Sequence, residues 1–196
     1  MFFATRHALY RMRLLLPALL LALAMPAQAQ LRDLDRALIA AAERGDAATV
    51  QRLIGEGGNV NAQDENRNSA YLIAGARGRT EVLKLTLAAG ADLKSTNRYG
   101  GTALIPACHY GHVDTVREML KTKVDVNHVN NLGWTALLEA VILGDGGAKH
   151  AEIVRLLVSH GANPSLPDRD GVTPLQHAKR HGYATIASTL ERAGAR

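Results

Sequence analysis

The residues that could take part in acid–base chemistry are one carboxylate and several histidines in the C-terminal half of the chain. Glu139 lies among apolar residues, where a carboxylate must find a partner or solvent. His177 and His109 are its candidate partners, and a structural hydrogen bond is the simplest role for such a pair. Glu139 with His177 and Asp170, or His109 with His150, could supply an acid and a base.

No nucleophile elbow, zinc-protease helix or phosphate-binding loop accompanies these residues. The segment 144–147 is rich in glycine but lacks the lysine and serine that follow in a phosphate-binding loop. The sequence therefore predicts no catalytic residues, and an enzyme is only an alternative interpretation.

Metal ligation is a further possibility. His177 and His181 are four residues apart, which could place two zinc or copper ligands on one helix, but a third ligand is missing. Cys108 is the only cysteine, so an internal disulfide is excluded. It stands at an alanine-like position, which predicts a buried and inert thiol. We expect neither a metal nor a cofactor.

The elements that position these residues repeat along the chain. Four glycines are spaced by 33 residues and a fifth follows 38 residues later: Gly45, Gly78, Gly111, Gly144 and Gly182. Nine residues before each of the last four stands a hydroxyl residue that can cap a helix N-terminus: Ser69, Thr102, Thr135 and Thr173. Apolar residues at helical spacing lie on both sides of each glycine. Each unit is therefore predicted to be two short antiparallel helices followed by a turn.

The repeating unit resembles the ankyrin repeat. The segments 171–175 (GVTPL), 111–113 (GHV) and 156–163 (LLVSHGAN) match the family's helix start, inter-helix turn and second helix with its exit. The resemblance covers residues 31–196. It implies an all-α solenoid of about five helix pairs joined by β-hairpin-like fingers, with a concave surface that usually binds a protein. Lys123 stands where the family has a glycine with positive φ, at a cost of roughly 1 kcal/mol.

Residues 1–29 are predicted to be a secretory signal peptide that is cleaved before Gln30. Three arginines precede the apolar run 14–25, and small residues stand at 27 and 29. The run is shorter than the roughly 20 residues that span a bilayer, so we expect no stable membrane insertion after cleavage; an uncleaved anchor is the alternative. Loss of the leader arginines lowers the formal charge from +5, which gives no support to nucleic-acid binding. The expected location is periplasmic or secreted.

Residues 30–196 form the predicted ankyrin repeat domain. Its repeats are expected at about 33–63, 64–96, 97–129, 130–167 and 168–196. The fourth repeat contains a five-residue insertion, because ten positions rather than five separate Gly144 from Val154. The resulting loop is predicted at the foot of the concave groove. It is either a small-molecule or metal-binding module or a tolerated surface insertion. The candidate loop residues are Asp145, Lys149 and His150.

The resemblance also places partner contacts on the concave face, at the finger tips and at the ends of the inner helices. These positions are apolar or aromatic in the third and fourth repeats and charged at the edges, as in a protein interface. Trp134, the only tryptophan, is predicted to be a binding anchor in an exposed finger; packing on Tyr99 or Val172 is the alternative. The predicted partner-binding residues are Arg77, Tyr99, His109, Tyr110, Leu132, Trp134, Ile142, Leu143, Arg169, Asp170, Val172, Arg180 and His181.

These observations predict a non-enzymatic scaffold that acts in the bacterial periplasm. We expect its concave face to bind another protein of the cell envelope.

Overall fold

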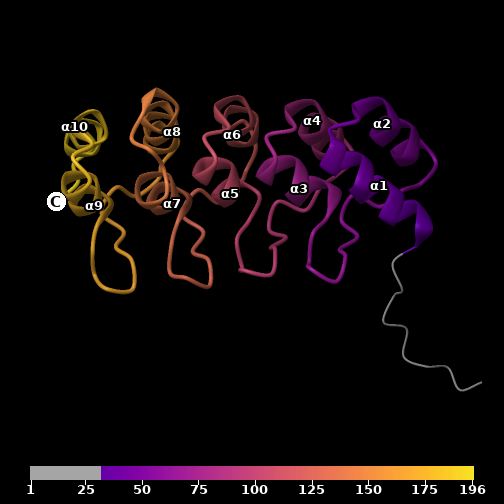
Figure 1. Ribbon diagram of the computed structural model, residues 1–196, viewed down its shortest axis with the longest axis horizontal. Helices are drawn as coiled ribbons and strands as arrows, with labels where there is room; N and C mark the ends of the chain where they lie inside the picture. The colour runs from indigo at the N-terminus through magenta and orange to yellow at the C-terminus, as the bar shows by residue number, and fades with distance from the viewer. Residues whose placement is uncertain (1–31) are drawn as a thin grey trace, which may run out of the picture. The chain divides into compact units, whose positions relative to one another are not determined.

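The computed structural model describes residues 32–196, and the predicted signal peptide lies outside this part of the chain. The described residues form ten α-helices in five pairs (Figure 1). The helices are α1 (Asp33–Arg44), α2 (Ala47–Gly55), α3 (Ala70–Ala76), α4 (Thr80–Ala88), α5 (Leu104–His109), α6 (Val113–Leu120), α7 (Ala136–Ile142), α8 (Ala148–Ser159), α9 (Pro174–Arg180) and α10 (Ala184–Arg192). The predicted all-α fold of about five repeats is confirmed.

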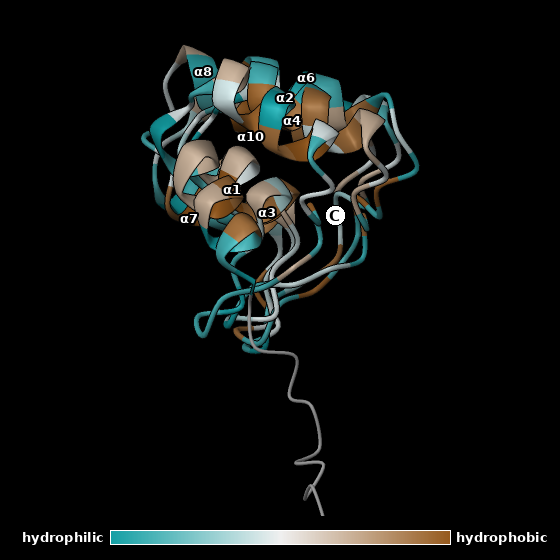
Figure 2. Cartoon of the chain, turned by 90° about the vertical axis from the view of Figure 1, so that its right-hand side faces the viewer, coloured by the Kyte–Doolittle hydropathy of each residue, from teal (hydrophilic) through white to brown (hydrophobic). Residues whose placement is uncertain are grey.

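The helix pairs stand in a row and form two layers. The odd-numbered helices make an inner layer next to the fingers, and the even-numbered helices make an outer layer (Figure 1). The outer helices turn their hydrophobic residues toward the inner layer (Figure 2). Fully buried side chains such as Leu104, Leu137, Leu157 and Ile186 fill the space between the layers. Each pair therefore buries its apolar surface mainly against its neighbours.

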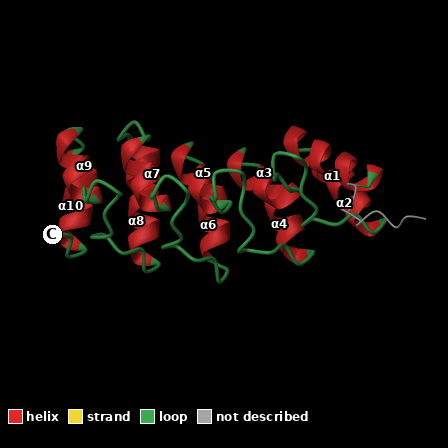
Figure 3. Ribbon diagram, turned by 90° about the horizontal axis from the view of Figure 1, so that it is seen from below, coloured by secondary structure: helices red, strands yellow, loops and turns green. Residues whose placement is uncertain are grey.

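The fingers that join successive pairs are loops. No residue between 32 and 196 is in a β-strand, and Figure 3 shows only helices and loops. The expectation of β-hairpin-like fingers is wrong in this respect. Two backbone hydrogen bonds close each finger instead. In the fourth repeat they run from the Asn130 N–H to the Trp134 carbonyl and from the Gly133 N–H to the Asn130 carbonyl, both at 3.0 Å.

Three of the four predicted helix caps are present. The side-chain oxygen in each case accepts a hydrogen bond from the backbone N–H three residues later, which satisfies one of the free donors of the first turn. The distances are 3.2 Å for Ser69 to Leu72, 3.2 Å for Thr135 to Leu138 and 3.3 Å for Thr173 to Gln176.

Thr102 does not cap its helix, contrary to the prediction. Its buried Oγ1 has no hydrogen-bond partner, and α5 begins after Ala103 without a side-chain cap. In the other repeats, the N–H four residues after the cap bonds to the cap's carbonyl, as from Glu139 to Thr135. The residue at that place is Pro106, which has no N–H. The Thr102 carbonyl accepts instead from Ile105 N–H at 3.2 Å, which removes the donor that a capping hydroxyl would use.

The turn of the fourth repeat uses a different glycine from the one that the spacing predicts. Gly111 has φ +71°, but Gly144 is not among the glycines with positive φ, and Gly146 has φ +68° in its place. A Cβ at Gly144 would collide with the carbonyl oxygen of Ala140, so this glycine is needed for close packing. The insertion is partly absorbed by α8, which has 12 residues against 8 in α6.

Lys123 is not strained, contrary to the prediction. Arg67, with φ +59°, is the one residue other than glycine with positive φ in the described part of the chain. After α6 the Thr122 hydroxyl donates to the Met119 carbonyl at 2.6 Å and accepts from Val124 N–H at 3.2 Å. This side chain takes over the capping that a left-handed glycine provides after other helices, so Lys123 can keep an ordinary backbone conformation.

The difference between Thr135, which caps its helix, and Thr102, which does not, can be tested. We expect Thr135→Val to lower the free energy of unfolding by about 1 kcal/mol, because a capping hydrogen bond is lost. The matched Thr102→Val should leave it unchanged or raise it by up to about 1 kcal/mol, because that hydroxyl is buried without a partner. Urea unfolding of both variants measures the difference. Equal losses would show that Thr102 caps its helix in solution.

Candidate functional site

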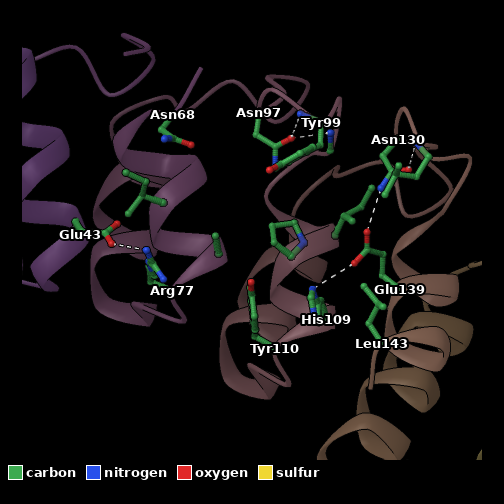
Figure 4. Close-up of a pocket in the computed structure, with 16 residues that line it drawn as sticks. Glu43, Asn68, Arg77, Asn97, Tyr99, His109, Tyr110, Asn130, Glu139 and Leu143 are labelled. Carbon is green, nitrogen blue, oxygen red and sulfur yellow. Dashed lines mark hydrogen bonds and ion pairs between the residues drawn. The ribbon is translucent and has the colours of Figure 1, made fainter. Parts of the chain in front are cut away.

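A cavity of about 390 Å³ opens on the concave side of the second to fourth repeats. Side chains from α3, α5 and α7 and from the fingers before them line it, together with Glu43 of α1 (Figure 4). Four large apolar residues around it are exposed to solvent. They are Tyr99 at 53%, Tyr110 at 58%, Leu132 at 49% and Leu143 at 42%.

These four residues come from different elements. Tyr99 and Leu132 lie in neighbouring fingers, and the Asn131 N–H donates to the Tyr99 carbonyl at 2.9 Å across that gap. Tyr110 and Leu143 follow the last turns of α5 and α7. The stacking of repeats therefore collects into one place residues that are more than 40 positions apart in the sequence.

Glu139 is the carboxylate of this cavity, and it is only 6% exposed. Asn130 Nδ2 donates to its Oε1 at 3.1 Å, and His109 Nδ1 lies 3.5 Å from its Oε2 (Figure 4). Burial raises the pKa of Glu139 to about 7, an effect that the Asn130 hydrogen bond partly offsets. Burial also lowers the pKa of His109, and the nearby His150 lowers it further. Close to neutral pH the two groups therefore have little tendency to form a charged pair.

The concave surface continues from this cavity toward the N-terminal repeats. Arg77 and Glu43 form an ion pair of 2.7 Å at the edge of the cavity. A second cavity of about 390 Å³ shares these two residues and extends to Arg36 of α1 and Glu65 of the first finger. We refer to the two cavities together as the groove.

Comparison with known proteins agrees with this architecture. The profile of the family described as "Ankyrin repeats (3 copies)" matches residues 37–130, 71–166 and 123–196. The chain belongs to the ankyrin repeat family.

Two solved structures and one curated protein show the likeness. An ankyrin repeat domain from Acinetobacter baumannii is 55% identical, covers 81% of each chain and superimposes with a TM-score of 0.80. The ankyrin repeat protein EF0377 is 38% identical over 85% of this chain and 87% of its own, with a TM-score of 0.78. The ankyrin repeat protein YahD of Escherichia coli K12 is 51% identical over 57 residues, which are 29% of this chain and 28% of YahD.

The fingers of the second to fifth repeats each begin with an Asp or Asn whose side chain fixes the conformation of the finger. The sequence analysis did not single out these residues. The Oδ1 of each residue accepts hydrogen bonds from the backbone N–H groups two and four residues later, as Asn130 does from Leu132 and Trp134 at 2.9 and 3.0 Å. Such residues hydrogen-bond their own turn readily. The signal was present in the sequence, because these residues recur at intervals of 33, 33 and 38. They are Asp64, Asn97, Asn130 and Asp168.

The same finger residue explains why a carboxylate is accepted at position 139. In the fifth repeat, Asp168 Oδ2 bonds to His177 Nε2 at 2.7 Å, nine residues away. In the fourth repeat the corresponding pair is Asn130 and Glu139. An amide donor thus faces Glu139, where an aspartate would repel it. The prediction that His109 is a partner of Glu139 is confirmed to the extent that the two are neighbours. The prediction that His177 is a partner is wrong.

His150 and Asp145 of the insertion in the fourth ankyrin repeat make contacts within the protein. His150 is 8% exposed, with Nε2 at 2.9 Å from the His109 carbonyl and Nδ1 at 2.8 Å from Asp145 Oδ1. It packs over Gly111 as His112 packs over Gly78. His150 therefore resumes the repeat pattern after the extra residues and ties the fourth repeat to the third. Lys149 is exposed.

The other predicted contact residues lie away from the cavity that contains Glu139. Trp134 and Ile142 are half-buried and do not line it, so the indole is more covered than expected of an exposed finger. The predicted residues of the fifth repeat do not line it either: Arg169, Asp170, Val172, Arg180 and His181. Arg77, Tyr99, His109, Tyr110, Leu132 and Leu143 are the predicted residues that the fold brings together around it.

The proposed acid–base sets are not assembled. His177 pairs with Asp168 rather than with Glu139, and His150 contacts the backbone of His109 rather than its ring. Cys108 is fully buried, as predicted, and burial raises the pKa of its thiol. Within residues 32–196, no three His, Cys, Asp or Glu side chains are grouped to hold a metal ion, and no helix is long and apolar enough to cross a membrane.

The raised pKa of Glu139 predicts a pH dependence of stability. Below pH 4.5 the carboxyl is protonated in the folded and the unfolded chain. Between pH 4.5 and about 7 mainly the unfolded chain loses this proton, so the free energy of unfolding falls as the pH rises, by roughly 3 kcal/mol in all.

Glu139→Gln keeps the acceptor for Asn130 and removes this titration. We expect the variant to match the wild type near pH 4.5 and to exceed it at pH 8, as measured by urea unfolding at both values. His109 titrates in both proteins, so the difference between them reports on position 139. A variant that is less stable at pH 8 would contradict burial of a protonated carboxyl.

Proposed function

We propose that this chain is an exported, non-enzymatic scaffold that binds another protein of the bacterial cell envelope through its groove. This chain belongs to the ankyrin repeat family, whose members in general serve as protein-interaction scaffolds, and this supports the proposal. The observation that carries the proposal is the exposure of Tyr99, Tyr110, Leu132 and Leu143 around one cavity. Contiguous exposed apolar surface of this kind usually marks a contact site.

The chemistry of the groove supports a protein partner. Tyrosine is among the residues that contribute most to binding when a partner covers them. Charged residues such as Arg36, Glu43, Glu65 and Arg77 lie at the N-terminal end of the groove, which gives it a polar margin. An apolar centre with a polar margin is the usual organisation of a protein interface.

The envelope location rests on the sequence of residues 1–29. A basic leader, an apolar run and small residues at positions 27 and 29 are the features of a cleavable secretory signal.

The binding proposal predicts loss of partner capture when the tyrosines are removed. The double variant Tyr99→Ala, Tyr110→Ala should recover at least tenfold less of the partner from an envelope extract, because two anchors contribute roughly 2 kcal/mol each. Val129→Ala is the matched control, since Val129 is 47% exposed and lies outside both cavities. Trp134→Ala tests the half-buried indole separately. Equal recovery of every captured protein by the wild type and the double variant would rule out the groove as the contact surface.

The location predicts a processed chain. We expect the protein to be released with the periplasmic or secreted fraction, with a mass that corresponds to a chain starting at Gln30. Mass spectrometry of the chain after expression in a bacterium measures this. Arg13→Glu together with Leu19→Arg, which disrupts the basic leader and the apolar run, should leave the chain unprocessed inside the cell. Recovery of the wild-type chain unprocessed and inside the cell would contradict export.

A further inference from the structure

One oxygen of the buried carboxylate in the groove is left without a firm partner. Glu139 Oε1 accepts a hydrogen bond from Asn130, but among the described residues Oε2 accepts none. His109 Nδ1 lies 3.5 Å from this oxygen, which is at the limit of hydrogen bonding. An ionised carboxylate can accept about four hydrogen bonds. Glu139 lines the cavity (Figure 4), so its remaining acceptor sites are available to a donor that enters there.

The walls of the cavity suit a long cationic side chain. Tyr99 and Tyr110 line it, and a cation is attracted to the face of an aromatic ring. The Arg98 guanidinium lies 4.8 Å from the centre of the Tyr99 ring, which shows that this ring already holds a cation on one face. Leu132 and Leu143 offer apolar surface on which the methylene groups of a lysine or arginine can pack.

The charge of the groove also favours a basic side chain of the partner. Four carboxylates line its two cavities, against two arginines: Glu43, Asp64, Glu65 and Glu139, with Arg36 and Arg77. Without the three leader arginines the formal charge of +5 becomes +2, so the groove still differs in sign from the rest of the repeat domain. Arg77 is already paired with Glu43 at 2.7 Å, and Arg36 lies 3.6 Å from Glu65. This field favours a basic partner and opposes phosphate groups.

We propose that the groove binds a polypeptide segment of the partner that places a lysine or arginine side chain on Glu139, with its methylene groups against Tyr99 and Tyr110. This inference rests on the proposed function and specifies the chemistry of the partner. The cation donates to Glu139 Oε2, and the tyrosines and leucines cover the rest of the side chain. Glu139 is then a specificity-determining residue rather than a purely structural one.

A displayed library of random dodecamer peptides tests the inference with the purified chain. The wild type should select peptides enriched in lysine or arginine at one position. Glu139→Gln, which preserves the acceptor for Asn130, should lose this enrichment. Glu81→Gln is the matched control, because it removes the same charge from an exposed position on α4 of the outer layer and should keep the enrichment. Circular dichroism verifies that the three proteins are folded.

A double-mutant cycle on one selected peptide measures the strength of the interaction between its lysine and Glu139. Replacing the selected lysine by glutamine should weaken binding to the wild type at least tenfold, and binding to the Glu139→Gln variant less than twofold. Selection of peptides without a shared cation, or equal enrichment in Glu139→Gln, would overturn the inference and leave the proposed function intact. Peptides that bind the Tyr99→Ala, Tyr110→Ala double variant as well as the wild type would overturn both.

Discussion

The structure depends on contact between neighbouring repeats, because a pair of helices as short as these cannot bury its apolar face alone. The inner helices have six or seven residues in four of the five pairs, and their leucines are covered only when the next pair is in place. Polar contacts reinforce this packing at each step. The side chain after each turn packs over the turn of the preceding repeat, as His112 does over Gly78 and Tyr183 over Gly146. Any departure from the repeat must therefore preserve these contacts.

The fourth repeat shows how such a departure is accommodated. Five extra residues separate Gly144 from His150, yet His150 still reaches the carbonyl of His109 in the third repeat. The left-handed turn moves to Gly146, and α8 gains residues at its N-terminus. The Tyr183 hydroxyl then donates to the Gly144 carbonyl at 2.9 Å and ties in the fifth repeat. The insertion thus changes the local chain path while the stacking of the repeats is kept.

The same stacking produces the groove. Finger residues and inner-helix ends are only partly covered by the next repeat, because they lie at the margin of the packed layers. In the third and fourth repeats these positions carry tyrosine and leucine, so apolar surface remains exposed. Asn130 links both features, since its oxygen holds the finger that carries Leu132 and its amide orients Glu139. One finger residue therefore shapes the rim of the cavity and positions its carboxylate.

The sequence by itself determined the repeat, its helical composition and most of its caps, because these depend on interactions within a few residues. Ser69, Thr135 and Thr173 could be identified from spacing alone, as could the burial of Cys108 on an apolar helix. Thr102 could not, since its role depends on the missing N–H of Pro106. The ordinary backbone of Lys123 likewise depends on a hydroxyl one residue earlier.

Tertiary structure alone decided what the neighbouring repeats cover. Spacing placed Tyr99 and Leu132 just before the glycine of a finger and Trp134 just after one. Only the stacked fold leaves Tyr99 and Leu132 open beside Glu139 and the indole half-buried. It also decided that His109, and not His177, faces that carboxylate. The physical reason is that a helical period fixes which side of its own helix a residue occupies, whereas exposure and pairing depend on side chains that the next repeat contributes.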